Sequence, residues 1–143
     1  NRQTQVATMI LLDTDHLSIL TDARHQYHTG LVTRLRSAHD YVVIPIVSVE
    51  EQLRAWLAHI HRTRDVRNHI YPYDRLIQLF KTIEARDIAR WTALSADEFA
   101  RLRNARIRIG TQASKIASIA LAYDAFVAVG QLAGFSASAG LAS

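Results

Sequence analysis

The sequence contains no cysteine among its 143 residues. This absence excludes disulfides and thiolate metal sites, and it favours a reducing compartment such as the cytoplasm. Long hydrophobic runs are also missing, because none reaches the roughly 18 apolar residues that a membrane span needs. Residues 1–8 are polar and unlike a signal peptide, so we interpret them as an N-terminal extension that precedes the domain.

The sequence also lacks the short motifs that mark several enzyme classes. It has no P-loop, no glycine-rich dinucleotide motif and no Gly-x-Ser-x-Gly nucleophile motif. The histidines do not form a helical zinc pair, since His59 and His61 are two positions apart and point to different faces of a helix. Acidic and basic residues are therefore the main candidates for a functional site.

Hydrophobic residues make up 49% of the chain and charged residues 21%, which at this length indicates one globular domain. The net charge of +4 comes entirely from the carboxy-terminal part. Residues 1–98 hold 12 Lys and Arg against 12 Asp and Glu, whereas residues 99–143 hold five against one. A basic segment of this kind is compatible with a phosphate-backbone partner, and a solvated helix face is the alternative interpretation.

Short apolar runs alternate along the chain with longer segments of helical periodicity. The strand-like runs are residues 9–12, 41–44 and 125–129, with a weaker one within 88–94. The helix-like segments are residues 15–20, 30–38, 48–60, 73–85, 95–106 and 111–123. This alternation predicts an α/β domain with a central, mostly parallel sheet of about four strands and helices on both faces. We place the domain at residues 9–135, and we expect the uncharged, small-residue tail at 136–143 to be loosely held.

Four acidic side chains follow the first two predicted strands. Asp13 ends the first strand with Asp15 two residues on, and Glu50 and Glu51 lie in the helix that follows the second strand. Ligands bind at the carboxyl ends of parallel strands, so we expect Asp13 and Glu51 to converge there. Converging carboxylates repel one another unless a cation binds between them, and oxygen ligands favour Mg²⁺ or Mn²⁺.

Each of these acids also has a plain structural interpretation. Asp13 is placed where it could cap the helix at residues 15–20, although Thr14 or Asp15 could do the same. Ser48 and Glu51 fit a capping box, the Ser-x-x-Glu pattern that begins a helix. Glu50 fits a solvated surface position.

The sequence around these residues resembles the PIN-domain ribonucleases of the VapC type, which are toxins of bacterial toxin–antitoxin pairs. Residues 11–18 are similar to the first motif of that family, residues 46–54 to the second, and residues 108–120 to the third. The similarity extends over residues 9–135. It implies a PIN-like domain in which Asp13 and Glu51 bind the metal and carry the catalysis.

The resemblance also implies an activity and its partners. We expect an endoribonuclease that uses Mg²⁺ or Mn²⁺ to hydrolyse structured RNA such as tRNA, with possible metal support from Asp15 and Glu50. The family further implies a homodimer and a cognate antitoxin that binds a hydrophobic groove between helices. Five apolar residues are candidates for that groove, with a role in the core as the alternative: Trp56, Leu57, Ile60, Phe80 and Ile83.

Two acidic positions of the family hold other residues in this sequence. Ala113 stands where the family has an aspartate before its third-motif helix, and Gly134 stands at the fourth acidic position. Losing two negative charges should weaken Mg²⁺ binding, and losing one group of an interdependent catalytic set commonly costs orders of magnitude in rate. We therefore expect impaired nuclease activity with the metal weakly bound or absent. The alternative is a non-catalytic PIN-fold module that binds RNA or an antitoxin.

Three basic residues near the third motif are candidates for binding RNA. Arg106, Arg108 and Lys115 belong to the segment that carries the whole net charge. We infer from this charge, and not from the motif, that they hold phosphate groups.

The alanine at position 113 has two interpretations, which are a deliberate inactivating substitution and natural decay of the gene.

Overall fold

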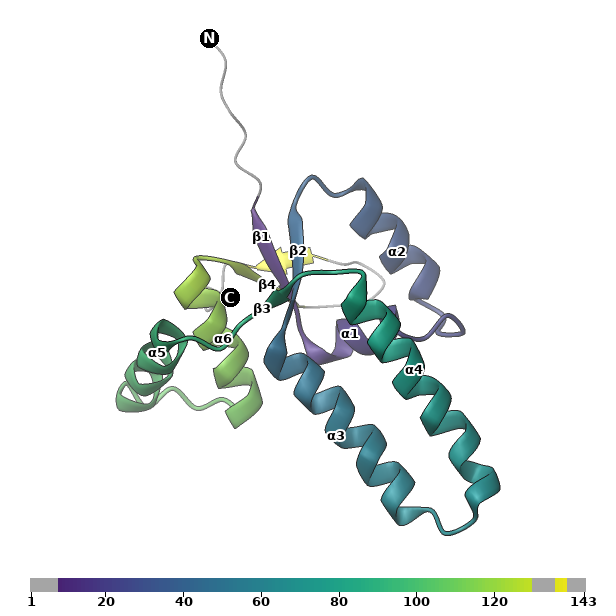
Figure 1. Cartoon of the computed structure of the whole chain (residues 1–143). Coiled ribbons are helices and arrows are strands. Elements are labelled where there is room, and N and C mark those ends of the chain that lie inside the picture. The colour runs from purple at the N-terminus through teal and green to yellow at the C-terminus, as the bar shows by residue number, and fades with distance from the viewer. Residues whose placement is uncertain (1–7, 130–135, 139–143) are drawn as a thin grey trace.

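The computed structural model describes residues 8–129 and 136–138 of the chain (Figure 1). Gly134, residues 1–7 of the predicted extension and residues 139–143 of the predicted tail lie outside the described residues. Within the described part of the chain, no helix is long and apolar enough to cross a membrane.

The described residues contain one five-stranded sheet with the strand order β3-β2-β1-β4-β5. Its strands are β1 Met9–Leu12, β2 Tyr41–Pro45, β3 Ile88–Ala89, β4 Phe126–Val129 and β5 Ser136–Ser138. The first four strands are parallel to one another, and β5 pairs antiparallel with β4. The predicted α/β class with a mostly parallel sheet is therefore confirmed.

Helices connect the parallel strands and cover both faces of the sheet. In the described ranges they are α1 Thr14–Leu20, α2 His28–Ser37, α3 Ile46–Arg62, the 3-10 turn η1 Val66–His69, α4 Ile70–Glu84, α5 Ala93–Asn104 and α6 Thr111–Tyr123. Figure 1 shows α5 and α6 on one side of the sheet and α1, α2 and α4 on the other. Parallel neighbours require such crossovers, because each strand must begin at the same edge as the one before it.

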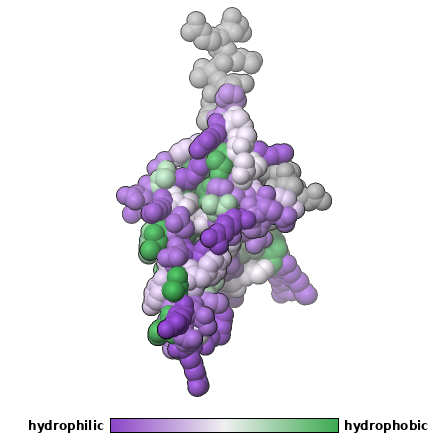
Figure 2. All heavy atoms as spheres, turned by 90° about the vertical axis from the view of Figure 1, so that its right-hand side faces the viewer, coloured by the Kyte–Doolittle hydropathy of each residue, from purple (hydrophilic) through white to green (hydrophobic). Residues whose placement is uncertain are grey.

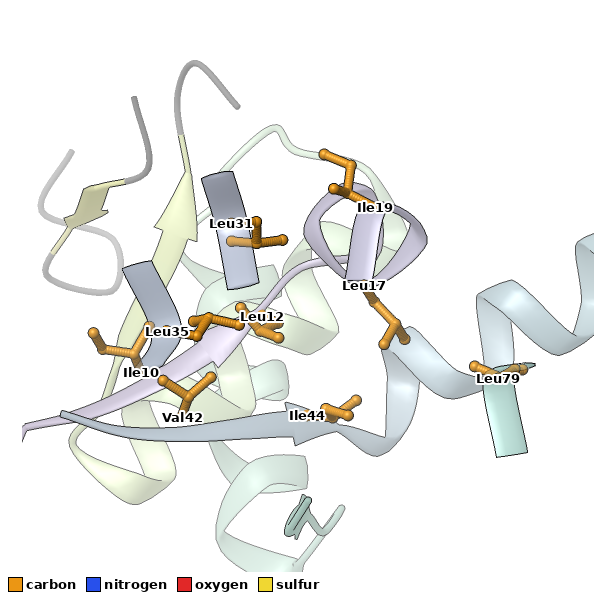
Figure 3. Close-up of a cluster of buried hydrophobic side chains, with 9 residues drawn as sticks. All are labelled: Ile10, Leu12, Leu17, Ile19, Leu31, Leu35, Val42, Ile44 and Leu79. Atoms are coloured by element: carbon orange, nitrogen blue, oxygen red, sulfur yellow. The ribbon is translucent and has the colours of Figure 1, made fainter. Parts of the chain in front are cut away.

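Alternate residues of the central strands build two separate cores. Ile10 and Leu12 of β1 pack on one face with Leu31 of α2, in the cluster drawn in Figure 3. Leu11 lies between them in sequence and packs on the opposite face with Ile119 of α6. Side chains alternate between the two faces of a strand, so a strand covered on both faces is apolar throughout. This geometry explains the uninterrupted apolar run at residues 9–12.

The start of α3 differs from the prediction. The helix begins at Ile46 directly after Pro45, and the Ser48 side chain makes no cap. Ser48 is instead fully buried, and its hydroxyl donates to the carbonyl oxygen of Leu12 at 3.1 Å. The predicted capping box of Ser48 and Glu51 is therefore wrong. The Ser-x-x-Glu spacing also places both side chains on one helix face, and here that face packs against the end of β1.

Two further boundaries differ from the sequence-based expectation. The cap of α5 is Thr92, whose side chain and that of Ser95 hydrogen-bond reciprocally to the backbone, so this helix begins before residue 95, the predicted start. Ser136–Ser138, which we assigned to the loosely held tail, form β5 on the edge of the sheet. Antiparallel pairing uses only backbone groups, and the lack of large side chains in this segment therefore does not prevent it.

A candidate site at the carboxyl edge of the sheet

Asp13 lies at the carboxyl end of β1 and caps α1. Its Oδ1 accepts a hydrogen bond from the backbone N–H of His16 at 2.9 Å, and the Nδ1 atom of the His16 ring lies 2.7 Å from the same oxygen. The Asp13 side chain is 27% exposed, whereas that of His16 is only 1% exposed. The structural interpretation of Asp13 as a helix cap is thus confirmed. The cap and the His16 contact both use Oδ1 of the carboxylate, and neither of them uses Oδ2.

Glu51 lies next to the start of α1, as the convergence of the strand ends predicts. The Thr14 hydroxyl donates to Glu51 Oε1 at 3.0 Å, and Thr14 directly follows Asp13. The Gln52 side-chain amide donates to the Thr14 carbonyl oxygen at 3.3 Å. Together with the bond from Ser48 to Leu12, these contacts hold the first turns of α3 against the end of β1.

Three residues that were not predicted as site residues belong to this arrangement. His16 orients Asp13, Thr14 orients Glu51, and Gln52 holds Thr14 in place. The only sequence signal for His16 is its position three residues after a capping aspartate. Thr14 and Gln52 have no local signal, because their partners lie 37 and 38 residues away along the chain.

The two acids proposed as support differ in their surroundings. Glu50 pairs with Arg54 at 2.5 Å and accepts a hydrogen bond from the side chain of Gln112 at 3.4 Å. Its charge is therefore already balanced, and it connects α3 to the start of α6. Asp15 is exposed in the first turn of α1.

The α6 side of the edge contributes no carboxylate. Ala113 is exposed in the first turn of α6, a turn that has no acidic residue and no side-chain cap. In the described residues, no group of three or more His, Asp or Glu side chains could hold a metal ion. Among these described residues, Asp13 and Glu51 therefore have no third acidic or histidine side chain placed with them to form such a group.

The three basic candidates do not occupy equivalent positions. Arg106 and Arg108 are exposed in the segment between α5 and α6. Arg106 has φ of 57°, the left-handed conformation that glycine adopts most easily. Its N–H and that of Ile107 bond back to the carbonyl oxygens of Arg103 and Leu102, which closes the end of α5. Lys115 is half-buried in α6, with its Nζ 5.9 Å from the centre of the Trp91 ring.

The five candidates for an antitoxin groove separate into two groups. Trp56, Ile60 and Ile83 are half-buried, and Ile83 packs against the core beneath α4. Leu57 and Phe80 are 49% and 54% exposed on the hairpin that α3 and α4 form. Figure 2 shows hydrophobic side chains spaced along one edge of the lower part of the molecule, where this hairpin lies. The core alternative holds for Ile83, and a docking role for Leu57 and Phe80 stays a prediction.

Comparisons with known proteins identify the fold. No protein-family model matches the sequence, and a search of curated proteins finds no match. Among solved structures, a chain of VapBC2 from Rickettsia felis, bound to a promoter DNA fragment, superposes with a TM-score of 0.63 and 13% identity over 87% of this chain and 88% of that chain. A chain of FitAcB from Neisseria gonorrhoeae gives 0.58 and 20% identity over 85% and 86%.

A third match is VapC20 from Mycobacterium tuberculosis, a toxin that cleaves the sarcin-ricin loop. It superposes with a TM-score of 0.53 and 16% identity, and the match covers 89% of this chain and 96% of that chain. These matches span almost the whole PIN-like region. The chain therefore has the α/β fold of the VapC-type PIN-domain toxins.

Proposed function

We propose that this chain is a PIN-type toxin of a toxin–antitoxin pair whose metal-dependent RNA cleavage is impaired. The observation that carries the proposal is the state of the carboxyl edge. Glu51 accepts the hydroxyl of Thr14, which directly follows Asp13, whereas the α6 side has Ala113 and no acid in its first turn. Two of the four acidic positions of PIN-type ribonucleases are therefore occupied by acids, on the fold that those enzymes have.

Asp13 and Glu51 are the residues that would hold Mg²⁺ or Mn²⁺. When bound, such an ion would make a water nucleophilic and stabilise charge on the phosphate. The contacts with His16 and Thr14 occupy one oxygen of each carboxylate and fix how the carboxylate is turned. The second oxygen of each group would then be the one that binds the ion. Asp15, two residues after Asp13, is exposed and would add negative charge near the ion. Two carboxylates bring two fewer negative charges than the four acidic positions of the family, and we expect weak binding for that reason.

RNA is the ligand that the charge distribution favours. Arg106 and Arg108 are exposed beside the start of α6, and Lys115 lies one turn further along it. Arginine and lysine that face solvent hold phosphate groups mainly through electrostatics, so RNA affinity should fall as salt rises.

The alternative is a binding module without catalysis, and one observation favours it. The exposed face of the α3–α4 hairpin carries Leu57, Ile70, Ile77 and Phe80, which are 49%, 66%, 49% and 54% exposed. Large apolar side chains that are exposed close together mark protein–protein interfaces. We propose this face for a cognate antitoxin or for a second copy of the chain, and it would function even if cleavage were lost.

The test is to restore the missing acid. Cleavage of a mixed tRNA pool would be measured under Mg²⁺ and Mn²⁺ titration for the parent chain, Ala113→Asp and Ala113→Asn. Asparagine matches aspartate in shape but not in charge, so it is the matched control. We expect metal-dependent cleavage by Ala113→Asp, faster than the parent and Ala113→Asn by two orders of magnitude or more.

Other results would change the proposal. Efficient metal-dependent cleavage by the parent would contradict impairment and would mean that another acid replaces the missing one. If Ala113→Asp is as inactive as the parent although it folds and binds Mn²⁺ more tightly, the binding-module alternative is favoured.

A further inference from the structure

A cavity of about 320 Å³ opens at the carboxyl edge of the sheet, beyond the ends of β2 and β3. It is lined by Ile46, Val47, Glu50, Trp91 and Lys115. The first three belong to the start of α3, which follows β2, and Trp91 follows the end of β3 by two residues. The cavity thus lies where open parallel sheets bind their ligands, but it uses residues outside the carboxylate pair.

Trp91 presents an aromatic surface that is fixed in position and open to solvent. It is 39% exposed, and the ring of Phe99 contacts it edge-to-face with centroids 6.1 Å apart and planes at 71°. Ile46, also in the lining, is 40% exposed. Tryptophan is usually well buried, so an indole that is both held and exposed indicates a surface for another flat group.

The charges around the cavity favour an anionic ligand. The Lys115 ammonium lies 5.9 Å from the centre of the Trp91 ring. The one acid in the lining, Glu50, is balanced by Arg54 at 2.5 Å. Lys115 lies over the Trp91 ring, and part of the indole stays exposed, so a flat base joined to a phosphate would find both an aromatic surface and a cation here.

We propose that this cavity binds one unpaired nucleobase of an RNA ligand, with the base stacked on Trp91 and its phosphate held by Lys115. The inference rests on the proposed function, because it assumes that RNA is the ligand. Proteins that recognise unpaired RNA commonly stack bases on aromatic side chains. The cavity volume is at the lower end of the range for small-molecule sites, which suits a single base. An aromatic side chain of a protein partner would fit the volume but would bring no phosphate to Lys115.

The test compares RNA with and without bases. Binding of a labelled, mixed-sequence single-stranded RNA oligonucleotide would be measured by fluorescence anisotropy without divalent metal. An abasic oligonucleotide of the same length keeps the phosphates and serves as the comparison ligand. We expect Trp91→Ala to weaken binding of the normal oligonucleotide by about 5- to 150-fold. Trp91→Phe should retain most of the affinity, and the abasic oligonucleotide should bind weakly to all variants.

A second readout reports on the ring itself. The chain has two tryptophans, so Trp56→Phe leaves Trp91 as the only indole. Its fluorescence should be quenched by the normal oligonucleotide and not by the abasic one. Leu94→Ala is the matched control, because Leu94 is 63% exposed on α5 and does not line the cavity. This variant should bind both oligonucleotides like the parent, and circular dichroism would check that every variant is folded.

The outcomes separate this inference from the proposed function. If the parent binds RNA and folded Trp91→Ala binds it equally well, the inference is overturned and the proposed function is unaffected. If the parent binds no RNA, the RNA part of the proposed function fails and the inference fails with it. If Trp91→Ala loses binding to a protein partner while RNA binding is unchanged, the cavity belongs to that partner and the inference is also overturned.

Discussion

At the carboxyl edge of the sheet, the side formed by α1 and α3 differs from the side formed by α6. On the first side the residues proposed for catalysis also stabilise the fold, and on the second side they do not. In the half formed by α1 and α3, both Asp13 and Glu51 also have a structural task. Asp13 caps α1 and contacts the buried His16, and Glu51 accepts the hydroxyl of Thr14. In the half formed by α6, Ala113 is exposed and has no such task.

Because of this difference, the acids on the two sides are not equally strong evidence for nuclease activity. An acid that caps a helix is favoured by stability even when catalysis is gone, so the presence of Asp13 and Glu51 is weak evidence for activity. An acid in the exposed first turn of α6 would add little to folding. Its absence therefore says more about function than the presence of the other two. The following variants test whether the two halves really differ in this way.

The largest expected effect is on restored cleavage. In the Ala113→Asp background, Glu51→Gln should reduce the rate about 100-fold or more, because it removes a metal-binding charge from an interdependent set. The fold should persist, since the amide oxygen can still accept the Thr14 hydroxyl. Single-turnover cleavage would be measured, with Glu84→Gln, an exposed glutamate on α4, as the control. Equal rates for Glu51→Gln and the control would show that Glu51 is only structural.

The next effect is on stability. Asp13→Ala should lower the free energy of unfolding by about 2 kcal/mol, because a helix cap is lost and the buried His16 loses a partner. Asp13→Asn should lose less, since asparagine is also a good cap. Asp15→Ala is the exposed comparison and should change stability by less than about 0.5 kcal/mol. Urea unfolding measures all three, and a loss for Asp13→Ala no larger than for Asp15→Ala would contradict the double role of Asp13.

Arg106 offers a smaller test on the α6 side. Arg106→Gly should raise the free energy of unfolding by up to about 1 kcal/mol, because glycine adopts the left-handed conformation without strain. The same change should weaken RNA binding severalfold and make it less dependent on salt, because one phosphate contact is removed. Arg106→Lys keeps the charge and the strain, so it should change neither. If Arg106→Gly leaves RNA affinity unaltered at low salt, Arg106 does not contact phosphate.

The smallest effect concerns the helix to which the missing acid would belong. The first turn of α6 has no acidic residue, so Ala113→Asp should raise the free energy of unfolding by about 0.3–1 kcal/mol through the helix dipole. Ala113→Lys should lower it by a similar amount, and both changes should shrink in high salt. Thermal unfolding at two salt concentrations measures this. A marked loss of stability in Ala113→Asp would mean that this position is restricted by packing after all.

Local patterns predicted the four parallel strands and most of the helices. The alternation of strands and helices, the apolar run at residues 9–12 and the positions of Asp13 and Glu51 at the strand ends follow from residues close in sequence. The capping box at Ser48 was wrong for the same reason. The pattern is local, but the Ser48 hydroxyl bonds to Leu12, 36 residues earlier.

The sequence by itself determined the fold class and the edge where a site would form, because side-chain periodicity and strand ends are local properties. Only the tertiary structure decided how that edge is built. It joined Thr14 to Glu51, placed Ser136–Ser138 in the sheet and set Trp91 and Lys115 beside one cavity. Each of these contacts joins residues distant in the chain, and their energies depend on the packing of whole helices rather than on neighbouring residues.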